Sequence, residues 1–188
     1  MKSNKNDLPS ISFIIIGVIA GLVAVLDYIG VVGFPIGVFG VSAFYIGAAF
    51  YTAFAIWFRI KGLLAIYIGL LIGSLFSGTF TIFAFILALG NVFGAAIPAL
   101  FFNKLGFNPE LKRFRDYVAF VISATILQNI ISATWVLTGF YLVGIMPAEA
   151  AFLASAGWIG GGIIVSLVIG IPLLKFTTPV IKKTTLIR

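Results

Sequence analysis

Six long apolar runs follow one another along the chain, and they constrain its fold more than any motif does. A helix needs about 20 apolar residues to cross roughly 30 Å of hydrocarbon, and the runs lack the alternation typical of strands. Backbone polar groups in lipid must also be satisfied within their own segment. The pattern therefore predicts an all-α integral membrane protein, a compact bundle of six transmembrane helices over residues 11–29, 38–58, 62–77, 80–102, 117–143 and 150–174.

Composition agrees with this class and excludes several kinds of chemistry. Hydrophobic residues make up 62% of the chain and charged residues only 9%, against about 25% charged in ordinary soluble domains. The chain has no cysteine and no histidine, which removes thiol and imidazole catalysis and most transition-metal or haem ligation. No catalytic triad or glycine-rich phosphate loop is present either. We therefore expect no enzyme activity, no cofactor and no metal site.

The 12 basic residues predict the orientation of the bundle. They lie before the first run, between the second and third, between the fourth and fifth, and after the sixth. Since lysine and arginine concentrate on the cytoplasmic side, both termini should be cytoplasmic. Basic residues beside membrane spans suit anionic lipid headgroups better than nucleic acid. We expect a multi-pass protein of the cell membrane, with residues 1–188 forming one transmembrane domain and no soluble output domain.

Two connections between the runs have distinctive sequences. The predicted outer connection "GVVGFPIGVFG" (residues 30–40) is apolar and rich in glycine and proline, so it suits either a lid over the bundle or a tight turn in the interface. In the predicted inner connection "FNPELKRFRDY", Asn108 followed by Pro109 and Glu110 predicts a helix start. Lys112 and Asp116, four residues apart, would form a solvated pair on that helix.

A few polar side chains interrupt the apolar runs. Asn91 lies near the middle of the fourth run, and Gln128 and Asn129 lie near the middle of the fifth, so contact between them is feasible. We predict that Asn91 faces an inward stripe of the fifth helix. There it either forms hydrogen bonds between the helices or lines a ligand site. The stripe comprises Thr125, Gln128, Ser132 and Trp135, which follow helical spacing.

Asp27 and the small residues each allow two interpretations. Asp27 lies near the outer end of the first run, where it is either a carboxylate that reaches water or a contact for a ligand or cation beneath the outer loop. Small residues recur at four-residue spacing, for example at Ala20 and Ala24. This spacing serves close helix packing, within the chain or against another subunit.

Four segments of the central and C-terminal sequence have a familiar pattern: "YIGLLIGSLFSG" (67–78), "ALGNVFGAAIPALFFNKLGF" (88–107), "RFRDYVAFVISATILQNIISATWVL" (113–137) and "WIGGGIIVSLVIGIPLLKF" (158–176). Together they resemble the first type of the membrane-associated sensor domains, the MASE family. The chain departs from the family pattern at Ser74, where an asparagine is common, and at Gly161 and Gly162, where an aspartate is common. The resemblance implies a prokaryotic sensor module, either truncated or working through a separate partner.

The leading hypothesis is a stand-alone membrane sensor domain that binds a small ligand and signals to a cytoplasmic partner. The candidate ligand contacts are Asp27, Asn91, Gln128, Asn129, Trp135 and Trp158, and the candidate partner contacts are Lys112, Arg113 and Arg115.

Two alternatives remain. The chain also resembles the substrate-binding subunits of energy-coupling-factor vitamin transporters, and Ala20 and Ala24 would then contact a membrane partner. A scaffold without a ligand is the second alternative.

Overall fold

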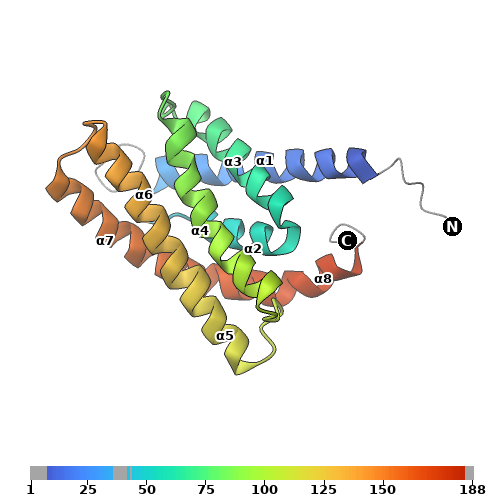
Figure 1. The fold of residues 1–188 in the computed structure, drawn as a ribbon. Helices are drawn as coiled ribbons and strands as arrows, with labels where there is room; N and C mark the ends of the chain where they lie inside the picture. Colours follow the sequence, from blue (N-terminus) through green and yellow to red (C-terminus); the bar gives the residue numbers. More distant parts are fainter. Residues whose placement is uncertain (1–7, 36–41, 43, 185–188) are drawn as a thin grey trace.

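The computed structural model describes residues 8–35, 42 and 44–184, where helices are joined by turns and loops and an isolated bridge links Pro35 to Ser42. The helices of Figure 1 are α1 (Leu8–Gly33), α2 (Gly47–Phe58), α3 (Ile60–Phe76), α4 (Ala84–Lys104), α5 (Phe114–Phe120), η1 (Val121–Leu127), α6 (Gln128–Leu142), α7 (Ala148–Val165), η2 (Ser166–Gly170), η3 (Leu173–Thr177) and α8 (Thr178–Lys183). The segments η1, η2 and η3 are π-helical. They lie within two long rods, α5–η1–α6 and α7–η2–η3–α8. The predicted all-α fold is confirmed.

Four helices of the described chain are long and apolar enough to cross a membrane: Ile11–Gly33, Ala84–Lys104, Phe114–Leu142 and Ala148–Lys183. The helices α2 and α3 are shorter, with 12 and 17 residues. At a rise of 1.5 Å per residue, α2 covers only about 18 Å, which is less than the roughly 30 Å of hydrocarbon. The chain is a multi-pass membrane protein. Its predicted second span, 38–58, forms a helix only from Gly47, and residues 38–41 and 43 lie outside the described residues.

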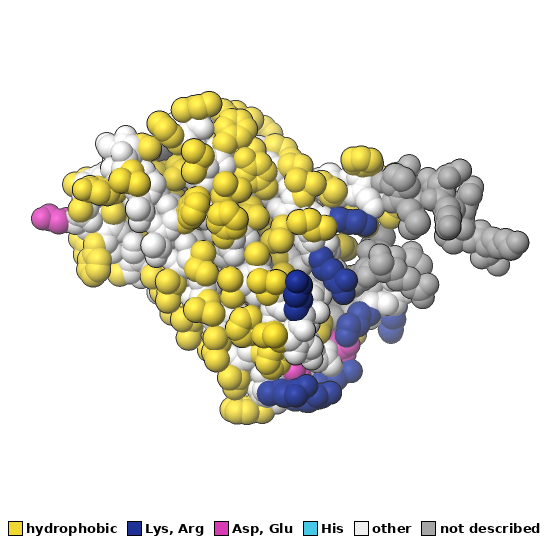
Figure 2. Space-filling model, in the orientation of Figure 1, with side chains coloured by type: hydrophobic (Ala, Val, Ile, Leu, Met, Phe, Trp, Pro, Cys, Tyr) yellow, Lys and Arg dark blue, Asp and Glu magenta, His cyan; other side chains and the backbone are white. Residues whose placement is uncertain are grey.

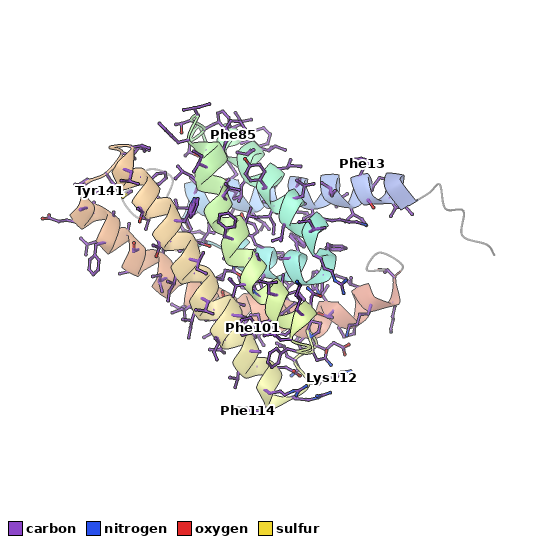
Figure 3. All side chains as sticks on the ribbon, viewed as in Figure 1. Phe13, Phe85, Phe101, Lys112, Phe114 and Tyr141 are labelled. Carbon is purple, nitrogen blue, oxygen red and sulfur yellow. The ribbon has the colours of Figure 1, made fainter. Side chains whose placement is uncertain are left out.

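The outer surface is suited to lipid. Large apolar side chains are exposed along the helices, among them Phe13 (74% exposed) and Phe114 (84% exposed), and Figure 3 shows both on the outside of the bundle. Hydrophobic side chains likewise cover most of the body in Figure 2. In water such a surface would be an aggregation hazard, so the fold requires a hydrocarbon environment around it.

Basic side chains gather at one end of the molecule, which we call the basic end (Figure 2). Specific contacts hold this arrangement together. Lys61 Nζ donates a hydrogen bond to Ser12 Oγ (2.8 Å) near the start of α1, and Arg59 Nε donates to Asn103 Oδ1 (3.4 Å) near the end of α4. Lys182 of α8 pairs with Glu110 at 2.7 Å. The start of α1, the α2–α3 turn, the end of α4 and α8 therefore meet at the basic end.

Small residues let α1 and α3 pack closely. A Cβ atom added at Gly69 of α3 would lie 2.6 Å from the Ala20 carbonyl oxygen and 2.5 Å from Val23 Cβ. One turn further along, a Cβ at Gly73 would lie 2.5 Å from Asp27 Oδ2. The two helices thus touch through backbone atoms, as small-residue spacing predicts for packing within the chain.

The connection before α5 differs from its prediction. The helix begins at Phe114 rather than near Asn108, because Leu111 has a positive φ of 52° that a helix cannot contain. Asn108 Oδ1 instead accepts a hydrogen bond from the backbone N–H of Glu110 (3.0 Å) and forms a turn. The expected Lys112–Asp116 pair is also wrong, since Lys112 pairs with Glu110 at 2.7 Å.

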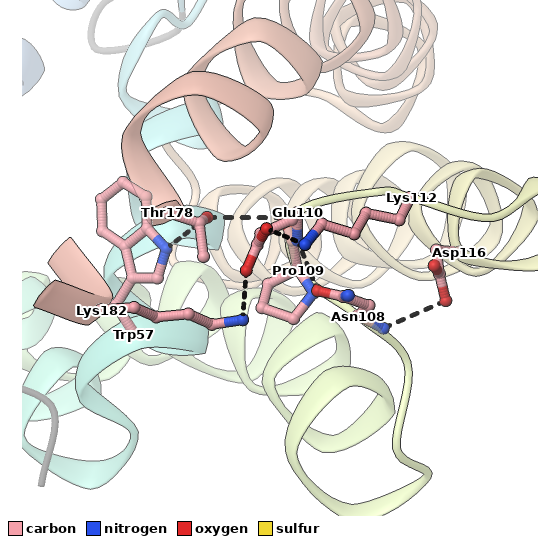
Figure 4. Close-up of polar contacts among 8 residues, drawn as sticks. All are labelled: Trp57, Asn108, Pro109, Glu110, Lys112, Asp116, Thr178 and Lys182. Atoms are coloured by element: carbon pink, nitrogen blue, oxygen red, sulfur yellow. Dashed lines mark hydrogen bonds and ion pairs between the residues drawn. The ribbon is translucent and has the colours of Figure 1, made fainter. Parts of the chain in front are cut away.

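A cluster of polar contacts at the basic end joins the connection before α5 to neighbouring helices (Figure 4). The fully buried Asp116 accepts hydrogen bonds from the backbone N–H groups of Asn108 and Arg113, each at 3.0 Å. Glu110 pairs with lysines from two segments, and these hydrogen bonds and charges hold the pKa of its carboxyl below the ordinary value of 4.5. The connection 105–113 is therefore fixed to both α5 and α8.

Candidate functional site

A cavity of about 300 Å³ lies at the end of the bundle opposite the basic end. Its walls come from the second half of α1, the end of α3, the α3–α4 connection, the start of α4 and the end of α6, with Trp158 of α7. Since α3 begins at Ile60 beside the basic end and ends at Phe76, the cavity and the basic residues lie at opposite ends of one helix. The volume is at the lower limit of typical small-molecule sites.

A buried carboxylate and a tyrosine belong to the polar wall of the cavity, and a second tyrosine lies behind them. Asp27, which is 7% exposed, lines the cavity and accepts a hydrogen bond from the Tyr45 hydroxyl group. The Tyr45 and Tyr51 oxygens are 2.7 Å apart. Because Tyr45 uses its only proton on Asp27, Tyr51 must donate to Tyr45. The three side chains form a directed chain of hydrogen bonds that ends on the carboxylate.

Ser42 adds a polar atom without a partner. It lines the cavity and is only 3% exposed, and its Oγ makes no hydrogen bond within the described part of the chain. The bridge to Pro35 holds it beside the end of α1. A buried hydroxyl group without a partner costs free energy, and such groups are rare unless water, an ion or a ligand satisfies them.

Aromatic rings and an amide complete the wall. Trp158 and Tyr45 both line the cavity, and their ring centroids are 5.8 Å apart. Phe140 contributes a third ring, and Asn91 lines the cavity from α4. Three of the six predicted ligand contacts, Asp27, Asn91 and Trp158, therefore share one cavity wall.

The polar stripe of the fifth run lies elsewhere. Thr125, Gln128 and Ser132 are buried, as predicted for an inward face. However, Gln128 Oε1 accepts a hydrogen bond from Thr52 (2.5 Å) and its Nε2 donates to the Ala48 carbonyl oxygen (2.9 Å). Gln128 therefore joins α6 to α2, outside the cavity lining. The expected partnership between Asn91 and this stripe is not formed.

Asn129 and Trp135 also lie outside the cavity lining. Asn129 donates to the Thr125 carbonyl oxygen (2.8 Å), and its amide packs on Gly162 of α7. Trp135 is 40% exposed, and its Nε1 donates to the Ile86 carbonyl oxygen (2.9 Å). Both side chains make helix–helix contacts.

The candidate partner residues divide into two groups. Ala20 and Ala24 are 3% and 2% exposed, because the bundle itself covers this face of α1, with α3 packed against Ala20. In this fold the alanine pair serves packing within the chain. Lys112, Arg113 and Arg115 are exposed at the basic end, where they are accessible from the aqueous side.

Sequence reasoning missed the roles of Tyr45 and Ser42 in the cavity wall. Both follow the outer connection, of which residues 36–40 lie outside the described residues. Tyr45 is 18 positions from Asp27, and no periodicity links a residue before a helix with one inside another helix. A carboxylate is rare in an apolar run, and this rarity alone predicts that Asp27 has a polar partner nearby, such as a hydroxyl group.

Comparison of the chain with protein-family models, with curated proteins and with solved structures finds no match. The resemblances to sensor domains and to transporter subunits therefore stay predictions. Within the described residues, no three His, Cys, Asp or Glu side chains group closely enough to hold a metal ion.

Proposed function

We propose that the protein is a membrane sensor domain that binds a small ligand in the cavity and signals to a cytoplasmic partner at the basic end. The observation that carries the proposal is the cavity itself, where Asp27, Asn91 and Trp158 converge with the unpartnered hydroxyl group of Ser42. Convergent polar groups in a largely apolar cavity are typical of binding sites. An ionisable residue inside a membrane segment is also most often functional.

The rod α7–η2–η3–α8 connects the cavity to the basic end, so it could transmit a conformational change between them. Trp158 lies in α7 at the cavity, and the same rod continues to Lys182 in α8, which pairs with Glu110 at the basic end. The 24 positions between them span at most about 36 Å, the length at the α-helical rise of 1.5 Å per residue. A ligand that favours one position of Trp158 would bias this rod, provided that its affinity differs between two packing states.

The proposal includes a topology of six membrane segments with both termini in the cytoplasm. The gathering of lysines and arginines at one end supports it. Because the native chain has no cysteine, single cysteines at Ser77 and Lys183 can be labelled without background. In intact cells an impermeant maleimide should label the first position only. Labelling at Lys183 and not at Ser77 would reverse the orientation.

Native mass spectrometry after gentle extraction tests ligand binding. We expect a defined small molecule at one per chain, lost in Asn91→Leu and retained in the control Gln128→Leu, which changes an amide outside the cavity. A clean mass with only heterogeneous lipid, together with no stabilisation by any added small molecule, would argue against the sensor proposal.

Cross-linking tests the partner. A photoreactive residue at Lys112 should capture one defined protein, and the yield should change when ligand occupies the cavity. If wild type and Asn91→Leu give the same cross-linking yield when the ligand is present, ligand binding does not affect the contact with the partner at the basic end.

A further inference from the structure

We propose that the ligand is a small organic cation whose ammonium group contacts Asp27 in the cavity, beside the rings of Tyr45 and Trp158. This inference rests on the proposed function and adds the chemical class of the ligand. The shared chemistry is an ammonium group, either on a free amine or on a lipid headgroup.

The first argument is the charge of the cavity. The two ion pairs within the described residues both involve Glu110 at the basic end, so Asp27 has no ion-pair partner in that part of the chain. A carboxylate away from water is costly unless it is paired. Every described lysine and arginine lies at the basic end or on the segments that lead into it: Arg59, Lys61, Lys104, Lys112, Arg113, Arg115, Lys175, Lys182 and Lys183. Within the described residues no positive charge is placed to pair with Asp27, so a cationic ligand would supply one.

The second argument is the aromatic wall. Tyr45 and Trp158 both line the cavity, and Trp is the ring that attracts a cation most strongly. Phe140 lines the same cavity. A carboxylate combined with aromatic faces complements a quaternary or primary ammonium group, whereas an anionic ligand would be repelled by Asp27.

The third argument is the hydrogen-bond chain. The Tyr45 hydroxyl group donates to Oδ1 of the carboxylate, and the Tyr51 hydroxyl group bonds to the Tyr45 oxygen. The remaining acceptor capacity of the carboxylate and the unpartnered Ser42 Oγ suit N–H or O–H donors of a ligand. Amino alcohols carry both kinds of donor.

The test uses the full chain in nanodiscs of phosphatidylglycerol, which has no ammonium headgroup. Choline, ethanolammonium and the neutral choline isostere 3,3-dimethyl-1-butanol are titrated by calorimetry. We expect at least one of the two cations to bind at one per chain and the neutral isostere to bind at least about tenfold more weakly. Since this comparison uses the wild-type protein, it does not depend on any variant that must fold.

Two variants test whether the Asp27 carboxylate is the group that binds the cation. Asp27→Asn keeps the size of the side chain and should weaken cation binding by at least about tenfold. The control Glu149→Gln removes the same charge from the exposed first turn of α7, next to the α6–α7 connection, and should change binding by less than about twofold. Equal binding of choline and its neutral isostere, or undiminished cation binding by folded Asp27→Asn, would overturn the assignment.

The outcomes separate this inference from the proposed function. If neutral molecules fill the cavity and cations do not, the cation assignment fails and the binding site stands. If neither class binds the folded protein, both fail. In nanodiscs containing phosphatidylethanolamine, one lipid retained by the wild type and lost in Asp27→Asn identifies a headgroup as the source. Amine binding that this lipid leaves unchanged identifies a free cation.

Discussion

Replacement of Gly69 by alanine tests the packing that positions Asp27. Gly69 lies on α3 where it meets α1, and an added Cβ would lie 2.5 Å from Val23 Cβ and 2.6 Å from the Ala20 carbonyl oxygen. Contacts under 3 Å require the neighbours to move. A backbone oxygen cannot move by a change of rotamer, so α1 and α3 must separate.

The expected free energy combines two opposing terms. Alanine favours a helix over glycine by about 1 kcal/mol, whereas overpacking a close interface costs about 1–3 kcal/mol. Because the clash involves a backbone atom, we take the upper value, which gives a net loss of about 2 kcal/mol for Gly69→Ala. For a chain of this size this corresponds to a fall in Tm of roughly 4–8 °C.

The matched control is Gly21→Ala on α1. Gly21 is exposed and an added Cβ meets nothing within 4 Å, so only the helix term remains and stability should rise by up to about 1 kcal/mol. Thermal unfolding of both variants in one detergent, followed by circular dichroism, measures the difference. A Gly69→Ala protein as stable as Gly21→Ala would refute the close approach of α1 and α3.

Three further predictions concern other polar groups. Asp116→Asn weakens two hydrogen bonds from backbone N–H groups to a buried carboxylate, so we expect a loss of about 2–4 kcal/mol in denaturant unfolding and faster proteolysis of the connection 105–113. Glu110→Gln should lower stability by at most about 1 kcal/mol at pH 7. The depressed pKa of Glu110 means that its contribution is present above 4.5 and is lost as pH falls through the folded-state pKa, so variant and wild type should converge in unfolding curves at lower pH. Gln128→Leu should cost about 1 kcal/mol of stability through lost interhelical hydrogen bonds and leave ligand binding unchanged. Asn91→Leu should weaken ligand binding and leave stability nearly unchanged. Equal effects of the two variants on binding would contradict the boundary of the cavity.

The resemblances noted in the sequence gain no support from the comparisons, yet the site does not depend on them. The prediction of Asp27, Asn91 and Trp158 rests on the rarity of polar or amphipathic side chains in apolar runs. The same rarity also predicts Gln128 and Asn129, whose amide groups form hydrogen bonds within the bundle. Rarity in an apolar run identifies a buried polar side chain but does not tell whether its partner is another helix or a ligand.

The sequence by itself determined the all-α membrane class and the inward face of Thr125, Gln128 and Ser132. These follow from chain-local quantities, namely the length of an apolar run and the 3.6-residue period. Tertiary structure alone decided the short α2, the start of α5 at Phe114 and the joining of Asp27 to Tyr45. Each of these depends on how separate segments approach one another, because a cavity or a hydrogen bond between helices is set by relative positions that no single segment encodes.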